Sequence, residues 1–304
     1  MNRTLASLLL ILLIQCGLVL ATFLPAIENR RAPLEPMASF TRDRVDVIYV
    51  GDEFDNETVL AKSGERWTLP ELENLPADSA MIDKLLDAIM DSHGNWPVAS
   101  SVAARQRFQV ASYHYRRRIR LQEGNAALGT FFLGESPGFR KVYARNESQD
   151  AIYSILFNAH EAPGNSGAWL DRKLLQTRTP VRITADAYSL QREGEQWFSG
   201  TGHAPDKREL QALLDVLRGL QIDGIATEDE QRDLAEAEAD LIFIVESLAG
   251  TVTLELFHRG DGYFIHSSEY SLFFTISAYE YDRLAGIDVG LVSGEPDPDG
   301  NNAG

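Results

Sequence analysis

Two stretches of the chain share one pattern of hydrophobic and polar positions: a tryptophan in a short polar run, a turn, and an amphipathic helix. In the first stretch Trp67 precedes Asp78, after which apolar residues recur at spacings of three and four. The second stretch repeats this about 130 residues later with Trp197 and Asp206. Such self-similarity predicts an internal duplication. We expect structural roles for these residues: the aspartates cap helices, and the tryptophans pack.

Short apolar runs separated by Gly-rich turns predict antiparallel strands around each helix. In the first module they cover 45–50, 58–62, 66–69, 115–121, 127–133, 141–145 and 151–155. In the second module they cover 181–183, 188–192, 241–246, 251–257, 263–266 and 272–277, and an acidic helical stretch occupies 228–239. Antiparallel strands with one main helix laid on the sheet make each module α+β.

These patterns divide the chain into five segments. They are a signal-anchor or transmembrane segment at 1–31, a stem at 32–44, a first α+β repeat at 45–178, a second α+β repeat at 179–290 and a disordered tail at 291–304. The tail is expected because its residues are rich in Gly, Pro, Asp and Asn, which bury little apolar surface. A chain of 304 residues is long enough for two domains with their own cores.

The run from 5 to 24 is apolar and carries no charged side chain. At 1.5 Å per residue, about 20 residues match the ~30 Å hydrocarbon core of a bilayer, so this run can span a membrane. Three interpretations stay open: a retained signal anchor, a cleaved signal peptide ending near Ala21, and a lipoprotein signal at Cys16. The retained anchor is favoured because the apolar run continues past Ala21. It would hold the protein in a bacterial inner membrane, with the bulk of the chain in the periplasm.

Composition and charge exclude several classes of function. The 28 basic and 45 acidic residues give a net charge of −17, which disfavours nucleic-acid binding. Cys16 is the single cysteine, so the rest of the chain offers no disulfide and no thiol catalysis. The six histidines do not pair at metal-ligand spacing, and we predict no metal and no cofactor. Nucleotide-binding fingerprints are absent, so any ATPase that this protein serves must be another chain.

One basic cluster interrupts this acidic chain. Alternation along a strand places Arg116, Arg118 and Arg120 on one face, opposite Arg117 and Ile119. Such a face could bind an anionic partner, such as a phospholipid headgroup or an acidic glycan. The alternative, which we favour, is a solvated sheet face paired with some of the surplus carboxylates.

The sequence also contains three neighbouring residues of the types used by serine hydrolases. Ser166 lies in a Gly-rich string between His160 and Asp171. A serine nucleophile needs a base within hydrogen-bond reach and an oxyanion hole, and triads usually gather from separate elements. Because no nucleophile elbow leads into a helix here, we favour a loop that joins the two modules and predict no catalytic residue.

Several segments together resemble those of a known family. They are Trp67 in a strand, the Pro76-Ala77-Asp78 helix cap, the Leu133-Gly134-Glu135 turn before 142–145, and the segment 169–175 that begins with Trp169. Over roughly residues 40–290 the chain resembles the bacterial envelope family catalogued as domain of unknown function 4340. In that family Trp169 would belong to a structural segment that closes the first module. The second half has no counterpart of this segment, which leaves open whether both modules make the same contacts.

The resemblance implies a membrane-anchored protein that accompanies the permease and ATPase of a gliding-motility-type ABC transporter. The family carries no established catalytic residues, so none is transferred to this chain. We therefore expect a non-catalytic accessory or binding protein, whose partners are the inner-membrane bilayer and these transporter subunits. The alternatives are a periplasmic hydrolase using Ser166 and a stand-alone ligand-binding or structural protein of the envelope.

Overall fold

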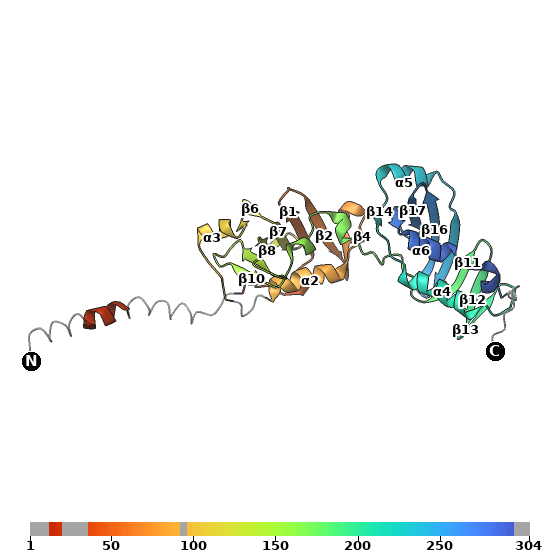
Figure 1. Ribbon diagram of the computed structural model, residues 1–304, viewed down its shortest axis with the longest axis horizontal. Coiled ribbons are helices and arrows are strands. Elements are labelled where there is room, and N and C mark those ends of the chain that lie inside the picture. Colours follow the sequence, from red (N-terminus) through yellow and green to blue (C-terminus); the bar gives the residue numbers. More distant parts are fainter. Residues whose placement is uncertain (1–11, 20–35, 92–95, 295–304) are drawn as a thin grey trace, which may run out of the picture.

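Two large antiparallel sheets form the framework of the protein, with helices laid on them (Figure 1). The computed structural model describes residues 12–19, 36–91 and 96–294. Within these ranges each large sheet has eight strands, and β5 (Val110–Ala111) and β6 (His114–Tyr115) form a small hairpin. The predicted α+β class with antiparallel sheets is confirmed.

The first sheet has the strand order β10-β9-β8-β7-β1-β2-β3-β4. Its strands are β1 (Val47–Asp52), β2 (Glu57–Ser63), β3 (Arg66–Leu69), β4 (Leu75–Pro76), β7 (Arg117–Glu123), β8 (Ala126–Leu133), β9 (Val142–Asn146) and β10 (Tyr153–Ile155). The same half of the chain contains the helices α2 (Ser79–Met90) and α3 (Val102–Arg107) and the 3-10 turns η1 (Arg42–Arg44), η2 (Pro70–Leu72), η3 (Ala159–Glu161) and η4 (Ser166–Trp169).

The second sheet has the strand order β13-β12-β11-β15-β16-β17-β18-β14. Its strands are β11 (Pro180–Ala185), β12 (Ser189–Glu193), β13 (Gln196–Ser199), β14 (Gly224–Ile225), β15 (Leu241–Ser247), β16 (Gly250–Arg259), β17 (Gly262–Ser267) and β18 (Phe273–Ile276). The helices are α4 (Lys207–Gly219), α5 (Glu228–Ala235), α6 (Ala278–Ala285) and α7 (Val289–Val292).

The two sheets follow the same order from one edge to the other. The first runs β3-β2-β1-β7-β8-β9-β10 and the second runs β13-β12-β11-β15-β16-β17-β18, so each has three strands before its main helix and four after it. Trp67 pairs with Lys62 across β3 and β2, and Trp197 pairs with Arg192 across β13 and β12. Each sheet has one additional edge strand, and these two strands lie at different edges. In the first sheet β4 pairs with β3, and in the second sheet β14 pairs with β18. This shared order is the arrangement that a duplicated module predicts.

An aspartate caps the main helix of each module. The Asp78 carboxylate accepts hydrogen bonds from the backbone N–H groups of Ala80 and Met81, at 2.9 and 3.2 Å. Asp206 repeats this geometry with Arg208 and Glu209, at 2.8 and 3.1 Å. Because the first N–H groups of a helix have no partner within it, these contacts fix where α2 and α4 begin.

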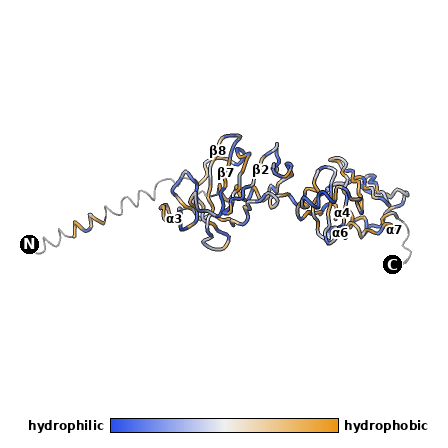
Figure 2. Tube along the Cα trace, turned by 90° about the horizontal axis from the view of Figure 1, so that it is seen from above, coloured by the Kyte–Doolittle hydropathy of each residue, from blue (hydrophilic) through white to orange (hydrophobic). Residues whose placement is uncertain are grey.

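Each main helix turns an apolar stripe to its sheet. The fully buried residues are Ile82, Leu85, Leu86 and Ile89 on α2, and Leu213, Val216 and Leu217 on α4. Hydrophobic and hydrophilic positions alternate along both modules, as Figure 2 shows for the strands β7 and β8 and the helices α4 and α6. The spacing of three and four along the helices therefore predicts the buried face correctly.

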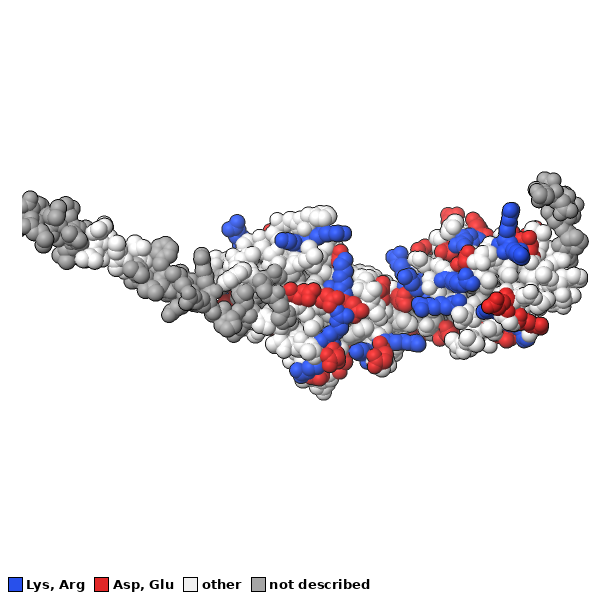
Figure 3. Space-filling model, turned by 90° about the horizontal axis from the view of Figure 1, so that it is seen from below, with Lys and Arg blue, Asp and Glu red and all other residues white. Residues whose placement is uncertain are grey.

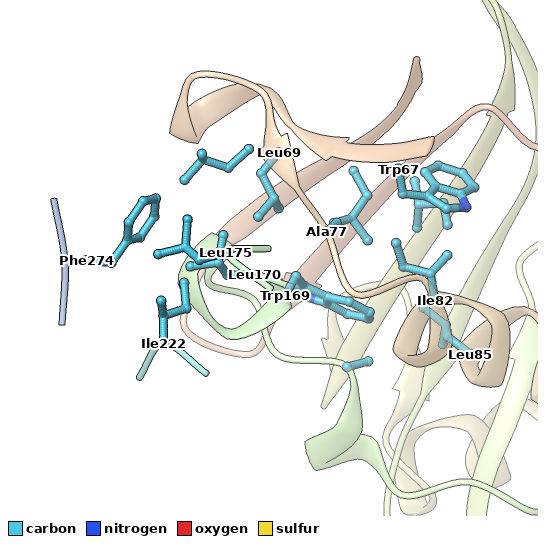
Figure 4. Close-up of a cluster of buried hydrophobic side chains, with 14 of the residues drawn as sticks. Trp67, Leu69, Ala77, Ile82, Leu85, Trp169, Leu170, Leu175, Ile222 and Phe274 are labelled. Atoms are coloured by element: carbon cyan, nitrogen blue, oxygen red, sulfur yellow. The ribbon is translucent and has the colours of Figure 1, made fainter. Parts of the chain in front are cut away.

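The segment that follows η4 holds the two modules together. Leu170 and Leu175 are buried and lie between the first module and the second module's Ile222 and Phe274 (Figure 4). The backbone of Asp171 donates to Pro76 O, and Thr177 donates to Leu217 O, each at 2.9 Å. One continuous buried cluster therefore includes residues of both sheets.

Two expected boundaries differ from the structure. Met37 and Phe40, in the expected stem, are buried against the first sheet, and the Asn146 side chain donates to Met37 O at 2.8 Å. The described part of the stem therefore packs on the first module, because its apolar residues find a place there. At the other end, α7 includes the first residues of the expected tail and buries Val292 fully. Residues 295–304 lie outside the described residues.

Most of the expected membrane segment, 1–31, also lies outside the described residues. Residues 12–19 are described and form an exposed helix that includes Cys16. Among all the described helices, none combines the length and apolar character needed to cross a membrane.

Candidate functional site

Strand β7 brings part of the arginine cluster onto one carboxylate. Arg118 and Arg120 share Glu57 of β2, with N–O distances of 3.1 and 2.7 Å. Strand β1 lies between β7 and β2, and its Gly51 is paired with both Arg118 and Glu57. Because Gly51 has no side chain, the guanidinium and the carboxylate meet above it. The Arg120 guanidinium also lies 4.3 Å from the ring centre of Tyr49.

Arg116 is separated from this cluster. It precedes β7, and its Nη1 lies 2.9 Å from both carboxylate oxygens of Glu53. The three predicted arginines therefore form two ion-pair groups rather than one basic face. Their side chains are about two-fifths exposed, between 37% and 42%. Pairs of such exposure contribute little to stability, and the Nε atoms of Arg118 and Arg120 are buried without a hydrogen-bond partner.

A pocket of about 430 Å³ adjoins Arg116 and Arg117. Glu53, Glu135 and His160 also line it, so its charge is mixed. The turn after β8 shapes the wall of this pocket. Gly134 donates to Tyr143 O at 2.8 Å, and a Cβ at this glycine would overlap with the backbone of Phe108.

The three residues of the hydrolase alternative lie apart. The Ser166 hydroxyl donates to Glu71 and lies 2.6 Å from the buried Thr58 hydroxyl. His160 lines the mixed-charge pocket, and the Asp171 carboxylate accepts from the backbone N–H of Lys173. Within the described residues, no hydrogen bond or ion pair joins Ser166 to a histidine. These contacts position Ser166 in the loop that closes the first module.

A second pocket, of about 460 Å³, lies at the junction of the modules. Arg66 of the first module, Arg178 of the connecting segment and Glu269 of the second module line it. Burial raises the pKa of Tyr270 next to this pocket, and the charge of Arg66 acts in the opposite direction. On the face in Figure 3, several basic side chains gather on the second module beside the junction. Sequence patterns did not indicate these residues, because folding alone brings together positions so far apart in the chain.

The predicted tryptophans differ in burial. Trp67 is 6% exposed, and Trp169 is fully buried with its indole N–H donating to Pro163 O at 2.8 Å. Trp197 is only partly buried and lines a smaller pocket in the second module. In the described part of the chain, no group of three His, Cys, Asp or Glu side chains has the arrangement of a metal site.

Comparison with known proteins gives one match. No curated protein and no solved structure matches the chain. A family model described as "Domain of unknown function (DUF4340)" matches residues 67–240. The match begins at Trp67 and ends just before β15, so it includes the connecting segment and parts of both sheets. This covers more than half of the chain, and the protein belongs to the DUF4340 family.

Proposed function

We propose that this protein is a non-catalytic accessory subunit of an ABC-type envelope transport assembly. Its amino-terminal segment anchors it in the bacterial inner membrane, and the two modules extend into the periplasm. The permease and the ATPase are separate chains. The apolar run at 5–24 and the membership of the DUF4340 family support this proposal.

The observation that carries the binding role is the junction. Segment 169–177 donates backbone hydrogen bonds to both modules, and Leu170 and Leu175 are 4% exposed between them. A junction with a buried core holds two modules as one body, which resists relative motion. Side chains from both modules line the pocket at this junction. A rigid surface of this kind suits a binding partner, because little ordering entropy is lost on association.

Affinity purification of the full chain from detergent-solubilised membranes tests the proposal. We expect a permease and an ATPase to co-purify, and Arg66→Glu in the junction pocket to reduce their recovery severalfold. Arg107→Glu, the same charge change on α3, is the matched control and should leave recovery unchanged. Recovery of neither subunit with the unmodified chain would contradict the transport role.

A further inference from the structure

The second module contains a small basic pocket around Trp197, here called the Trp197 pocket. Its volume is about 210 Å³, and its charged lining residues are Arg178, Arg192, Arg218 and Glu195. Three arginines against one glutamate make the lining net positive, although Asp215 next to the pocket pairs with Arg218, in a chain whose net charge is −17. A local excess of this sign attracts anions despite the acidic surroundings.

The three arginines come from separate elements and keep free donors. Arg178 lies just before β11, Arg192 is on β12 and Arg218 is in the last turn of α4. Arg192 Nε donates to Gly194 O at 2.9 Å, and Arg218 Nη1 lies 3.2 Å from Asp215, which also accepts from Gln211. Among the described residues Arg178 makes no ion pair. Since a guanidinium has five N–H donors, most donors of these three arginines make no hydrogen bond within the described residues.

The equivalent place in the first module lacks this character in the described residues. Arg192 pairs with Trp197 where Lys62 pairs with Trp67. Arg218 lies twelve residues after its helix cap, as Met90 does in the first module. The carboxylate of Asp43 lies within electrostatic reach of Lys62 and offsets its charge.

The tryptophans of the two modules follow the same contrast. Trp67 is buried in the core, whereas Trp197 is only partly buried and lines the pocket. The two copies share the scaffold, and among the described residues it is the second copy that places a partly buried tryptophan beside three arginines.

We infer that the Trp197 pocket binds a phosphate monoester carried on a small ring or headgroup. A phosphate monoester carries a charge of about −1.5 to −2 at pH 7, which complements the net positive charge of the pocket lining. Guanidiniums from three directions can each donate to a different oxygen of a tetrahedral anion. The side chains of Trp197 and Leu214, which line the pocket, then contact the ring that carries the phosphate. The pocket volume fits a monosaccharide phosphate, and a larger ligand would extend beyond the pocket.

Isothermal titration of the full chain with glucose 6-phosphate tests the site, with glucose as the uncharged control. We expect binding of the phosphate ester only, and about tenfold weaker binding for Arg192→Ala and for Arg218→Ala, since each loses a charged hydrogen bond. Arg208→Ala removes the same charge from α4 outside the pocket and should change the affinity less than twofold. Trp197→Leu should weaken glucose 6-phosphate while leaving inorganic phosphate unchanged.

Vesicles separate a lipid source of the phosphate from a soluble one. A lipid headgroup is the ligand if the protein binds vesicles containing phosphatidic acid more strongly than vesicles of phosphatidylcholine alone. This preference should then be lost in Arg192→Ala and kept in Arg208→Ala. Binding of glucose 6-phosphate without this difference would assign a soluble ester. Binding of neither probe, or equal losses in all arginine variants, would overturn the inference.

Arg178 lines both this pocket and the junction pocket, but Arg192, Arg218 and Trp197 line only this one, so variants at these three positions test the site separately from the transport role. Circular dichroism of each variant checks that it folds, so a loss of binding reports on the pocket. If no probe binds in the titrations but the permease and ATPase still co-purify, the transport role stands and the phosphate site is rejected. If glucose 6-phosphate binds but neither subunit co-purifies, the phosphate site stands and the transport role is rejected.

Discussion

At the scale of single residues, sequence patterns identify roles that depend on near neighbours. The caps Asp78 and Asp206 follow from their place before an apolar periodicity, and the structure places both side chains on the first N–H groups. The roles of arginines depend on distant partners. Arg145 is 3% exposed and donates to four backbone carbonyl oxygens, and nothing near it in the sequence distinguishes it from Arg118, whose side chain is 37% exposed. The tertiary fold determines whether a charged side chain is buried, so the burial of Arg145 could not be predicted from its neighbours in the sequence.

Gly134 is a residue at which a single methyl group should be costly. A Cβ there would lie 2.5 Å from Gln109 O and overlap with Phe108 O, and both atoms belong to the backbone. Backbone cannot move aside as a flexible side chain can, so Gly134→Ala should lower the free energy of unfolding by about 3 kcal/mol. Urea denaturation measures this. Gly219→Ala, at the end of α4 with nothing within 4 Å, should instead be neutral or stabilising.

Asp240 should make stability depend on pH. Burial raises its pKa, but hydrogen bonds from the His258 backbone at 2.5 Å and from Arg259 outweigh this, and its pKa lies below the ordinary 3.8. The folded state thus favours the charged form, so this stabilisation is present above pH ~4 and is lost as pH falls through the lower folded value. Asp240→Asn should cost about 1 kcal/mol at pH 7 and clearly less at pH 3, where part of this stabilisation is already lost.

Unfolding free energies of both proteins between pH 7 and 3 check this dependence. Asp261→Asn makes the same chemical change in the neighbouring β16–β17 turn and should show no such difference. A cost for Asp240→Asn that stays constant from pH 7 to 3 would contradict the assignment.

At the scale of elements, periodicity predicts the strands well and short helices poorly. The expected strand 127–133 becomes β8 (Ala126–Leu133), because its apolar run is long and ends at the Gly134 turn. The patterns indicate no element where helix α3 (Val102–Arg107) forms, since this helix has no buried residue and therefore no apolar stripe. Its start is set by Ser101, whose hydroxyl accepts from Ala104 N at 3.2 Å.

The two main helices should depend equally on their caps. Asp78→Ala and Asp206→Ala each leave two N–H groups without their acceptor, and each should lower the free energy of unfolding by about 1 kcal/mol. Asp78→Asn should retain most of the stability, because an amide oxygen still accepts. Thermal unfolding followed by circular dichroism measures these effects. The control Asp233→Ala, inside α5, removes a carboxylate that caps nothing and should be neutral or stabilising.

At the scale of the whole molecule, the duplication follows from the sequence, and the contact between the copies does not. The repeated tryptophan, cap and helix predict two modules, and the shared strand order agrees with them. Their contact depends on Leu170 and Leu175 in a segment that occurs once, and its partners Ile222 and Phe274 lie far along the chain. A repeat pattern cannot predict the contact between the copies, because the repeated apolar residues pack inside each copy and the residues of the contact are not repeated.

This contact should couple the unfolding of the two modules. Leu175 is 4% exposed, so Leu175→Ala should cost about 2–4 kcal/mol, most of it at the junction. We expect one calorimetric transition for the unmodified chain and two separated transitions for this variant, because each module keeps its own sheet and helix. Leu190→Ala removes an equally buried leucine from the second module's sheet and serves as the control.

The control separates loss of coupling from loss of stability. Leu190→Ala should lower the transition temperature without splitting the transition, since it leaves the junction intact. Splitting in both variants would mean that the modules unfold independently once either is weakened, and segment 169–177 would then be a tether rather than a rigid joint. In that case a partner could bind either module alone, and Arg66→Glu should no longer reduce recovery of the transporter subunits.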